Sequence, residues 1–308
     1  MFKLNLKSKL IVAVMLIMGV TTFMSCEKNG EIKSIPQTNN LEQTSKYYTS
    51  NTEELLFKLD TFNKSFIQTQ SIITNQRKPG WFKRVLGIVA ADIVGVAAGV
   101  KAGATLASAV GLATGGGGFI ATEVACGVIV GASASAKAGS TANTSPNPSI
   151  DNYDLPNNLP SLSQFISIGT KHNNYLYTVL YQQNTTQEDW FINNVNNYND
   201  VISNYLQRPE WIIFKNDFSI IINDYTKNGY NYNNLINICF QQNYLTNNER
   251  IILKSFFRIY KDVKTYEQIN NITTFYSHIV AYSYLSNNEK ESLISAFSVA
   301  KASPALWR

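Results

Sequence analysis

Glycine or alanine occupies every fourth position from residue 87 to residue 115, and no other feature of the chain constrains its fold as strongly. The positions are Gly87, Ala91, Gly95, Gly99, Gly103, Ala107, Gly111 and Gly115. On an α-helix this spacing leaves a stripe without bulky side chains, along which a second helix can approach until the backbones nearly touch. Because a helix has 3.6 residues per turn, the stripe drifts around the axis, and we expect the partner to cross at an angle.

The same four-residue step recurs further along the chain and predicts the partner helix. Its members, which follow the consecutive glycines at 115–118, are Gly127, Gly131, Ser135 and Gly139. We therefore predict a glycine-zipper helical hairpin formed by residues 85–113 and 119–139. A cluster typical of side chains that anchor a helix at a membrane interface comes just before it: Trp81, Phe82, Lys83 and Arg84.

This hairpin suits either a lipid bilayer or the core of a protein. Its frequent Val, Ile and Leu residues argue against a flexible linker or a disordered segment. Its charged residues argue against deep insertion, because each costs about 2.5–3.5 kcal/mol near the centre of a bilayer. They are Asp92, Lys101, Glu123 and Lys137. Asp92 and Lys101 are too far apart on one helix to pair directly, so each needs a partner from another segment or water.

The amino terminus predicts export. Three lysines precede the apolar run 10–20, and the small residue Ser25 precedes Cys26. This order resembles a bacterial lipoprotein signal peptide, which implies removal of residues 1–25 and lipidation of Cys26. An ordinary signal peptide or an uncleaved anchor is the alternative. Glu27, where inner-membrane lipoproteins carry Asp, favours the outer membrane by the same resemblance.

Composition divides the remainder of the chain. After the signal peptide at 1–25 we expect a polar tether at 26–50, an amphipathic helix at 51–78, the hairpin at 79–139, a Pro/Asn/Ser linker at 140–160 and a helical bundle at 161–308. Residues 245–250 nearly repeat at 285–290, which favours either a helical pseudo-repeat or an irregular helical bundle with similar helix starts.

Sequence signals for the starts of helices recur in the carboxy-terminal part of the chain. A Ser or Thr followed three residues later by Glu or Gln satisfies two free amide donors reciprocally. Such pairs occur at Ser50/Glu53, Ser161/Gln164, Thr185/Glu188, Thr246/Glu249, Thr265/Gln268 and Ser286/Glu289. Pro209 opens a further helix at its first turn. We expect an all-α fold, with about seven helices between 161 and 301 and no sheet.

Catalytic chemistry finds little support in the sequence. The two histidines, His172 and His278, have no Asp, Glu or Cys at the helical spacing of metal ligands, and we interpret His172 as a core residue. The consecutive glycines lack the Lys-Ser/Thr of a phosphate-binding loop. Cys126 and Cys239 fit buried thiols better than a disulfide framework. We therefore predict no enzymatic activity, no cofactor and no metal site.

Charge and aromatic content indicate the class of partner. The net charge of +5 is small, and no Lys/Arg stripe suggests nucleic acid. Membrane lipid and a second copy of the hairpin are the partners that we expect. The tyrosine-rich bundle could instead offer a face to a glycan or a protein ligand.

Scattered patches carry a resemblance to a known group. Residues 81–139 together with Gly169, His172, Asn173, Ala302, Ser303 and Trp307 resemble uncharacterised lipoproteins of Gram-negative bacteria that carry a glycine-zipper segment. The resemblance implies a lipid-anchored protein of the cell envelope and no known activity. The stripe alone is similar to the membrane-active hairpins of some bacteriocins and pore-forming toxins, so a secreted toxin is the alternative.

Overall fold

The computed structural model describes residues 47–72, 80–112, 116–141, 154–155, 162–181 and 204–307. All of them belong to one compact unit that runs from Thr44 to Arg308. Every regular element in this described part is a helix, and its β-type pairing is limited to an isolated bridge between Thr49 and Ser283. The prediction of an all-α fold is confirmed.

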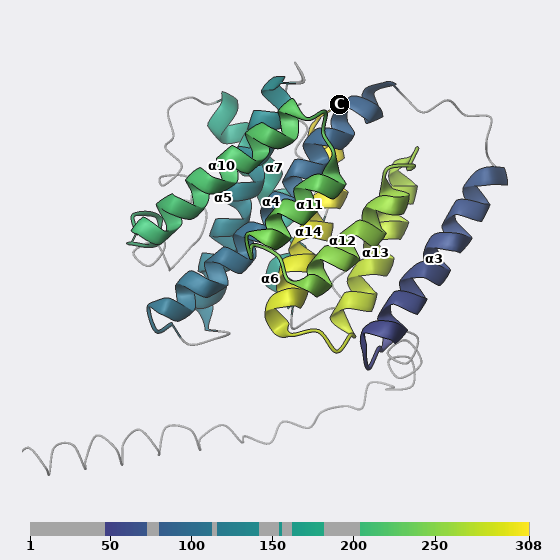
Figure 1. Cartoon of the computed structure of the whole chain (residues 1–308), viewed down its shortest axis with the longest axis horizontal. Helices are drawn as coiled ribbons and strands as arrows, with labels where there is room; N and C mark the ends of the chain where they lie inside the picture. The colour runs from purple at the N-terminus through teal and green to yellow at the C-terminus, as the bar shows by residue number, and fades with distance from the viewer. Residues whose placement is uncertain are drawn as a thin grey trace, which may run out of the picture. The chain divides into compact units, whose positions relative to one another are not determined.

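Figure 1 labels the helices of this unit. They are α3 (Thr52–Ile72), α4 (Gly80–Ala109), α5 (Gly117–Thr141), α6 (Ser163–Ile166), α7 (Ile168–Tyr181), α10 (Pro209–Lys227), α11 (Tyr232–Gln241), α12 (Asn247–Tyr260), α13 (Tyr266–Ala281) and α14 (Asn287–Leu306).

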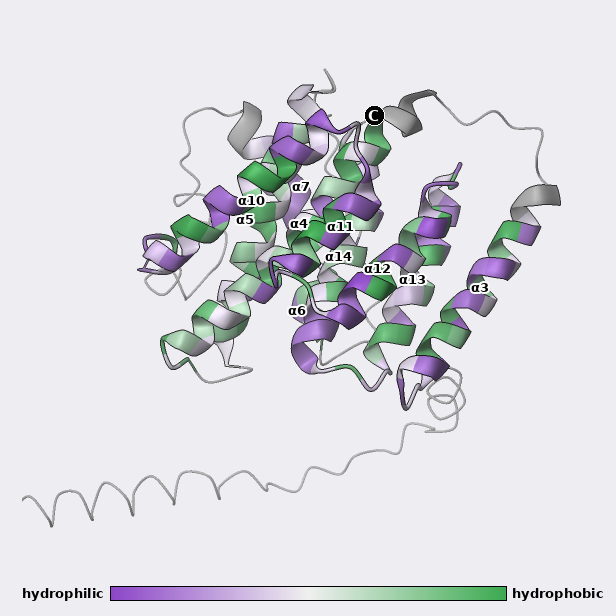
Figure 2. Ribbon diagram, viewed as in Figure 1, coloured by the Kyte–Doolittle hydropathy of each residue, from purple (hydrophilic) through white to green (hydrophobic). Residues whose placement is uncertain are grey.

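The predicted hairpin is present as α4 and α5, and it forms the middle of the unit. The two helices pack on each other along their length, while α7, α10, α11 and α14 cover their outer faces. Both are long and apolar enough to cross a membrane, yet 83% of each apolar window is buried inside the protein. In Figure 2 the surrounding helices α3, α10 and α12 alternate hydrophilic and hydrophobic residues, as expected for helices that cover a core.

Helix α4 ends earlier than the predicted residue 113, and Gly111 explains why. The amide of Leu112 donates to the carbonyl of Ala107 at 3.2 Å, and the amide of Gly111 donates to that of Ser108 at 3.0 Å. This pair of bonds closes a helix on a residue in the left-handed region, and Gly111 has a φ of 74°. Glycine adopts that conformation without the steric cost of a β-carbon.

Three of the predicted helix starts are present as reciprocal capping boxes. They are Thr246/Glu249, Thr265/Gln268 and Ser286/Glu289. The start predicted at Ser50/Glu53 is wrong by one residue. Asn51 caps α3 instead, accepting a hydrogen bond from the amide of Glu54 at 2.9 Å, whereas the hydroxyl of Ser50 donates to the carboxylate of Glu54 at 3.0 Å. The pairs at Ser161 and Thr185 lie outside the described residues.

The polar stretches at the ends of the expected tether and linker also take part in the fold. Thr49 is fully buried beside α13, and the ring of Tyr47 packs edge-on against His278 at a centroid distance of 4.9 Å. In the expected linker, the buried Leu155 donates through its amide to the carbonyl of Ile166 at 3.2 Å. The composition boundaries therefore separate kinds of sequence, whereas the hairpin and the carboxy-terminal helices share one core.

Side-chain hydroxyls attach the hairpin to its cover. Tyr225 of α10 donates to the carbonyl of Gly87 at 3.0 Å, and Ser292 of α14 donates to the carbonyl of Ala97 at 3.2 Å. Tyr230 donates to the carbonyl of Ala138 at 3.2 Å. Each bond gives a buried hydroxyl the partner that it needs in an apolar interior.

Candidate functional site

The glycine seam is the contact surface between α4 and α5. A β-carbon built on Gly95 would lie 3.2 Å from the Cα atom of Gly131, and one built on Gly103 would lie 2.8 Å from the Cα atom of Glu123. A β-carbon on Gly99 would lie 2.6 Å from the carbonyl oxygen of Cys126. The backbones thus touch, and the seam is filled within one chain. The helices run antiparallel, since positions that rise along α4 meet positions that fall along α5.

On α5, the glycines that face α4 make room for branched side chains of that helix. A β-carbon on Gly127 would lie 2.6 Å from the Cγ2 atom of Val100, and Gly131 takes the Cγ2 atom of Val96 in the same way. The seam therefore combines backbone contact with valine packing. Both valines are fully buried.

Other members of the predicted stripe have different surroundings. Gly87 accommodates the ring of Tyr230, whose Cδ1 atom would lie 2.6 Å from a β-carbon there. A β-carbon built on Gly111 would meet no atom within 4 Å, because this residue lies in the turn after α4. Ala91, Ala107 and Gly139 are buried in the unit. The stripe thus extends past the seam at both ends.

The remaining predicted site residues, or their side chains, lie outside the part of the chain that the structure describes. Cys26 and Gly115 lie outside the described residues. Trp81, Phe82, Lys83 and Arg84 belong to the first turns of α4, and their side chains lie outside the description as well. Lipidation and interface anchoring stay predictions.

A buried polar cluster joins three helices at the middle of the hairpin. Asp92 of α4, His172 of α7 and Ser303 of α14 are all fully buried. The Ser303 hydroxyl donates a hydrogen bond to Asp92 Oδ2. His172 Nε2 lies 3.5 Å from Asp92 Oδ1, at ion-pair distance. Asp92 thus finds the partners from other segments that its sequence position requires.

Electrostatics favour a charged pair in this cluster. Burial alone would lower the pKa of His172, but the nearby charge of Asp92 and the hydrogen bond with Asn173 outweigh burial and raise that pKa. A protonated histidine gains from a neighbouring acidic side chain in a medium of low dielectric constant. Asp92 therefore ties α4 to α7 electrostatically and to α14 by a hydrogen bond.

The contacts among Asp92, His172 and Ser303 do not suit nucleophilic catalysis. In a serine nucleophile the base accepts the hydroxyl proton, whereas here the hydroxyl of Ser303 is directed at Asp92 and not at His172. The cluster is also sealed from solvent. It acts as a structural tie between helices.

The patches that carry the lipoprotein resemblance meet around this tie. Asn173 Nδ2 donates to the carbonyl of Ala302 at 2.9 Å, and the amide of Gly169 donates to the hydroxyl of Ser298 at 2.8 Å. Gly169 has no room for a side chain, because a β-carbon there would collide with the Ser298 carbonyl. Only the fold brings these positions together; the one hint in the sequence was a carboxylate, Asp92, in an apolar helix that required a partner.

A second buried polar group lies nearer the tip of the hairpin. Glu123 is fully buried, and neither of its carboxyl oxygens has a hydrogen-bond donor among the described groups. Burial, and then the charge of Glu291 on α14, raises the pKa of Glu123 to about 9. The carboxyl group of Glu123 therefore keeps its proton at neutral pH. No group of three or more His, Cys, Asp or Glu side chains suited to a metal ion occurs within the described ranges.

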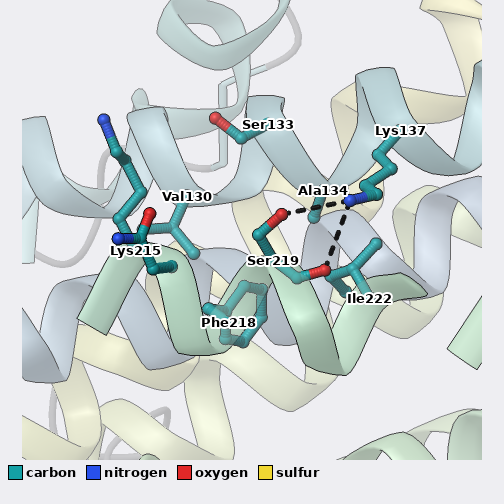
Figure 3. A pocket seen from close by; sticks show the side chains of 9 residues that line it. Val130, Ser133, Ala134, Lys137, Lys215, Phe218, Ser219 and Ile222 are labelled. Carbon is teal, nitrogen blue, oxygen red and sulfur yellow. Dashed lines mark hydrogen bonds between the residues drawn. The ribbon is translucent and has the colours of Figure 1, made fainter. Parts of the chain in front are cut away.

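A shallow groove between α5 and α10 has a volume of about 230 Å³. Its floor is apolar, with Val130, Phe218 and Ile222 among its residues. Lys137 crosses it and donates from Nζ to the hydroxyl of Ser219 at 3.1 Å and to its carbonyl at 3.4 Å (Figure 3). Lys137 thus finds its partner in α10, as a charged residue of an apolar helix must.

Several large aromatic side chains in the described part of the bundle lie in its interior. Trp211 and Trp307 are buried, as are Tyr175, Tyr260 and Tyr276. They fill the core and leave no aromatic platform of the kind that binds sugars at these positions.

Comparison with known proteins yields no relative for this chain. No protein-family model, no curated protein and no solved structure matches it.

Proposed function

We propose that this chain is a lipid-anchored, non-enzymatic protein of the cell envelope, in which the glycine-zipper hairpin forms the core of a membrane-associated helical bundle. The observation that carries the proposal is the enclosure of two bilayer-length apolar helices by α7, α10, α11 and α14. The covering helices shield the apolar surface of the hairpin from water within the protein itself. Attachment to the membrane then depends on the lipid that we predict at Cys26.

The chemistry of the buried polar groups supports a role without catalysis. Asp92, His172 and Ser303 hold helices together and have no access to solvent. The groove between α5 and α10 contains none of them. We therefore assign these three buried side chains a structural role in holding the helices together.

The closed seam limits self-association. Since Gly95, Gly99 and Gly103 already contact α5, another copy could use them only after the hairpin opened. A complex of closed copies would have to use surfaces of the covering helices. We therefore expect that two closed copies do not associate through the glycine seam.

The test is fractionation of cells that express the full chain. The control is a chain in which a cleavable signal peptide without a cysteine replaces residues 1–26, so that the sequence of the unit from Thr44 to Arg308 is unchanged. We expect the natural chain to incorporate a fatty-acid label and to sediment with outer membranes. The control should be released as a folded soluble protein. A control that stays in the membrane after an alkaline wash would show that the hairpin spans the bilayer and would overturn the proposal.

A secreted pore-forming toxin is the second candidate. The observation that favours it is that α4 and α5 each contain a 25-residue segment able to span a bilayer. Such a toxin would have to release the hairpin from its cover. Release of a trapped dye from liposomes by the mature chain would favour the toxin. Retention of the dye would favour the closed, anchored bundle.

A further inference from the structure

The structure accounts for three of the four charged residues in the apolar segments of the hairpin. Asp92 and Lys137 have partners on the covering helices, and a raised pKa keeps Glu123 protonated at neutral pH. The fourth, Lys101, forms no hydrogen bond or ion pair through its ammonium group with any described residue. A charge on a helix of the core needs a compensating partner. The surroundings of Lys101 therefore indicate which kind of partner would fit.

One buried carboxyl, that of Glu249 on α12, lies within reach of the charge of Lys101. Burial raises the pKa of Glu249, and the charge of Lys101 lowers it only in part. The carboxylate of Glu249 accepts from the amide of Thr246 at 2.5 Å and thereby completes the capping box of α12. Glu249 thus serves its own helix and does not form an ion pair with Lys101.

Lys101 lines a groove of about 290 Å³ between α4, α10 and the turn after α11. Ala98, Ala102 and Leu106 lie four residues apart on α4 and form an apolar row along one wall of this groove. At a rise of about 1.5 Å per residue the row is roughly 12 Å long. The volume is at the lower end of the range for small-molecule sites, about 300–1,000 Å³. The groove therefore suits a small, elongated apolar body.

The opposite wall is aromatic and is held in place by its own contacts. Phe214 of α10 packs edge-on against the ring of Tyr244 at a centroid distance of 4.8 Å, and the hydroxyl of Tyr244 donates to Asp217 at 3.4 Å. Asn243 has a φ of 59° and ends α11, with its amide donating to the carbonyl of Phe240 at 3.0 Å. The wall is thus formed before any ligand arrives, which lowers the cost of binding.

One further charged residue lines the groove, and its charge is already balanced. Glu210, in the first turn of α10, is bound by the guanidinium group of Arg208 at 3.3 Å and 3.4 Å. Among the described residues of the groove, Lys101 therefore carries the one charge without a counter-charge. The groove is complementary to a ligand with a single negative charge on an apolar body.

We propose that this groove binds a medium-chain fatty acid, which is an unbranched monocarboxylate. The carboxylate accepts hydrogen bonds from the ammonium group of Lys101, and the chain lies along Ala98, Ala102 and Leu106, opposite Phe214. A single apolar row suits one chain, and not the two chains of a phospholipid. The groove belongs to the closed unit, so binding requires neither the lipid anchor nor an open hairpin.

Calorimetric titration with octanoate tests the carboxylate contact, using the chain from Glu27 onward. Lys101→Gln should weaken octanoate binding at least roughly tenfold, because it removes a charge-assisted hydrogen bond. Lys101→Arg keeps the charge and should keep most of the affinity. Octanamide, which has the same chain without the charge, should bind equally to Lys101→Gln and to the natural chain. Lys137→Gln is the matched control and should bind octanoate normally.

Equal affinities of Lys101→Gln and the natural chain for octanoate would overturn the proposal. Circular dichroism spectra establish that each variant is folded.

The length of the ligand tests the apolar wall. Octanoate should bind more tightly than hexanoate, by up to about fourfold for each methylene that becomes buried. Ala102→Leu fills the groove from its wall and should abolish octanoate binding. Ser133→Leu adds the same side chain to the groove between α5 and α10 and should have no effect. Acetate or inorganic phosphate binding as tightly as octanoate would reduce the site to a simple anion contact and refute the proposal.

A photoreactive fatty acid locates the bound chain. Its cross-links should fall within residues 98–106 and 242–244 and should disappear when octanoate competes. Cross-links confined to 130–137 or 215–222 would place the chain in the groove between α5 and α10 and contradict the assignment. These results are separable from the anchor. An unlabelled Cys26 leaves octanoate binding in place, and a negative titration leaves the anchored protein in place.

Discussion

A β-carbon on Gly99 would lie 2.6 Å from the carbonyl oxygen of Cys126, and that oxygen belongs to the backbone of the facing helix. Neither atom can turn aside, as the end of a long side chain could. The close approach of α4 and α5 at this point therefore requires a residue without a β-carbon at position 99.

Gly99→Ala should lower the free energy of unfolding by about 1–3 kcal/mol, because the added methyl group forces the two helices apart. The better helix propensity of alanine, worth about 1 kcal/mol, should not compensate. Unfolding in urea, followed by circular dichroism, measures the change. Ser108→Ala, at an exposed position of the same helix, is the control and should have little effect. Equal stability of Gly99→Ala and the natural chain would refute the close approach.

Asp92→Ala should destabilise the protein by about 3–5 kcal/mol, since it leaves His172 buried without its counter-charge. His172→Ala should have a smaller additional effect in the background of Asp92→Ala than in the natural chain. A double-mutant cycle of urea unfolding measures this coupling. Strictly additive effects would mean that the two side chains do not interact.

The stability of the fold should fall as the pH rises. Burial raises the pKa of Glu123 to about 9, above the usual 4.5 of an exposed glutamate. Between these values the folded state keeps a proton that the unfolded state has lost, so the stabilisation is complete below the lower value and is lost toward the higher one. Glu123→Gln should flatten this dependence.

Urea midpoints measured between about pH 5 and pH 9 test the pH dependence. Burial also raises the pKa of Glu291 and of Glu249, so some slope should persist in the Glu123→Gln variant. Glu53→Gln, at an exposed position of α3, is the control and should keep the natural slope. A slope that is the same in Glu123→Gln and in the natural chain would contradict the buried carboxyl pair.

Asn63→Ala should loosen α3 more than the rest of the unit. Asn63 is fully buried; it donates to the carbonyl of Ser255 on α12 at 3.0 Å and accepts from the hydroxyl of Tyr276 on α13 at 3.0 Å. Loss of these bonds should cost about 1–3 kcal/mol. Amide hydrogen exchange should show the change first in α3. Lys64→Ala, whose side chain is 66% exposed, should leave the exchange of α3 unchanged.

The helices of this protein are readable from the sequence because their signals are local. Capping at Thr246, Thr265 and Ser286 depends on residues three positions away, and the structure has these caps. The spacing of Gly95, Gly99 and Gly103 likewise depends on helix geometry alone. The start of α3 was misplaced by one residue because Ser50 and Asn51 can both cap a helix, and only the contacts of Asn51 decide between them.

The sequence by itself determined that two glycine-striped helices pair, because a bare stripe can be buried only against another close surface. It did not determine what surrounds the pair. A buried protein core and a bilayer both remove apolar side chains from water, so hydropathy is the same for each. The tertiary structure decided in favour of the core: α7, α10, α11 and α14 enclose the hairpin, and Asp92 meets His172 and Ser303 across distances in sequence that no local pattern encodes.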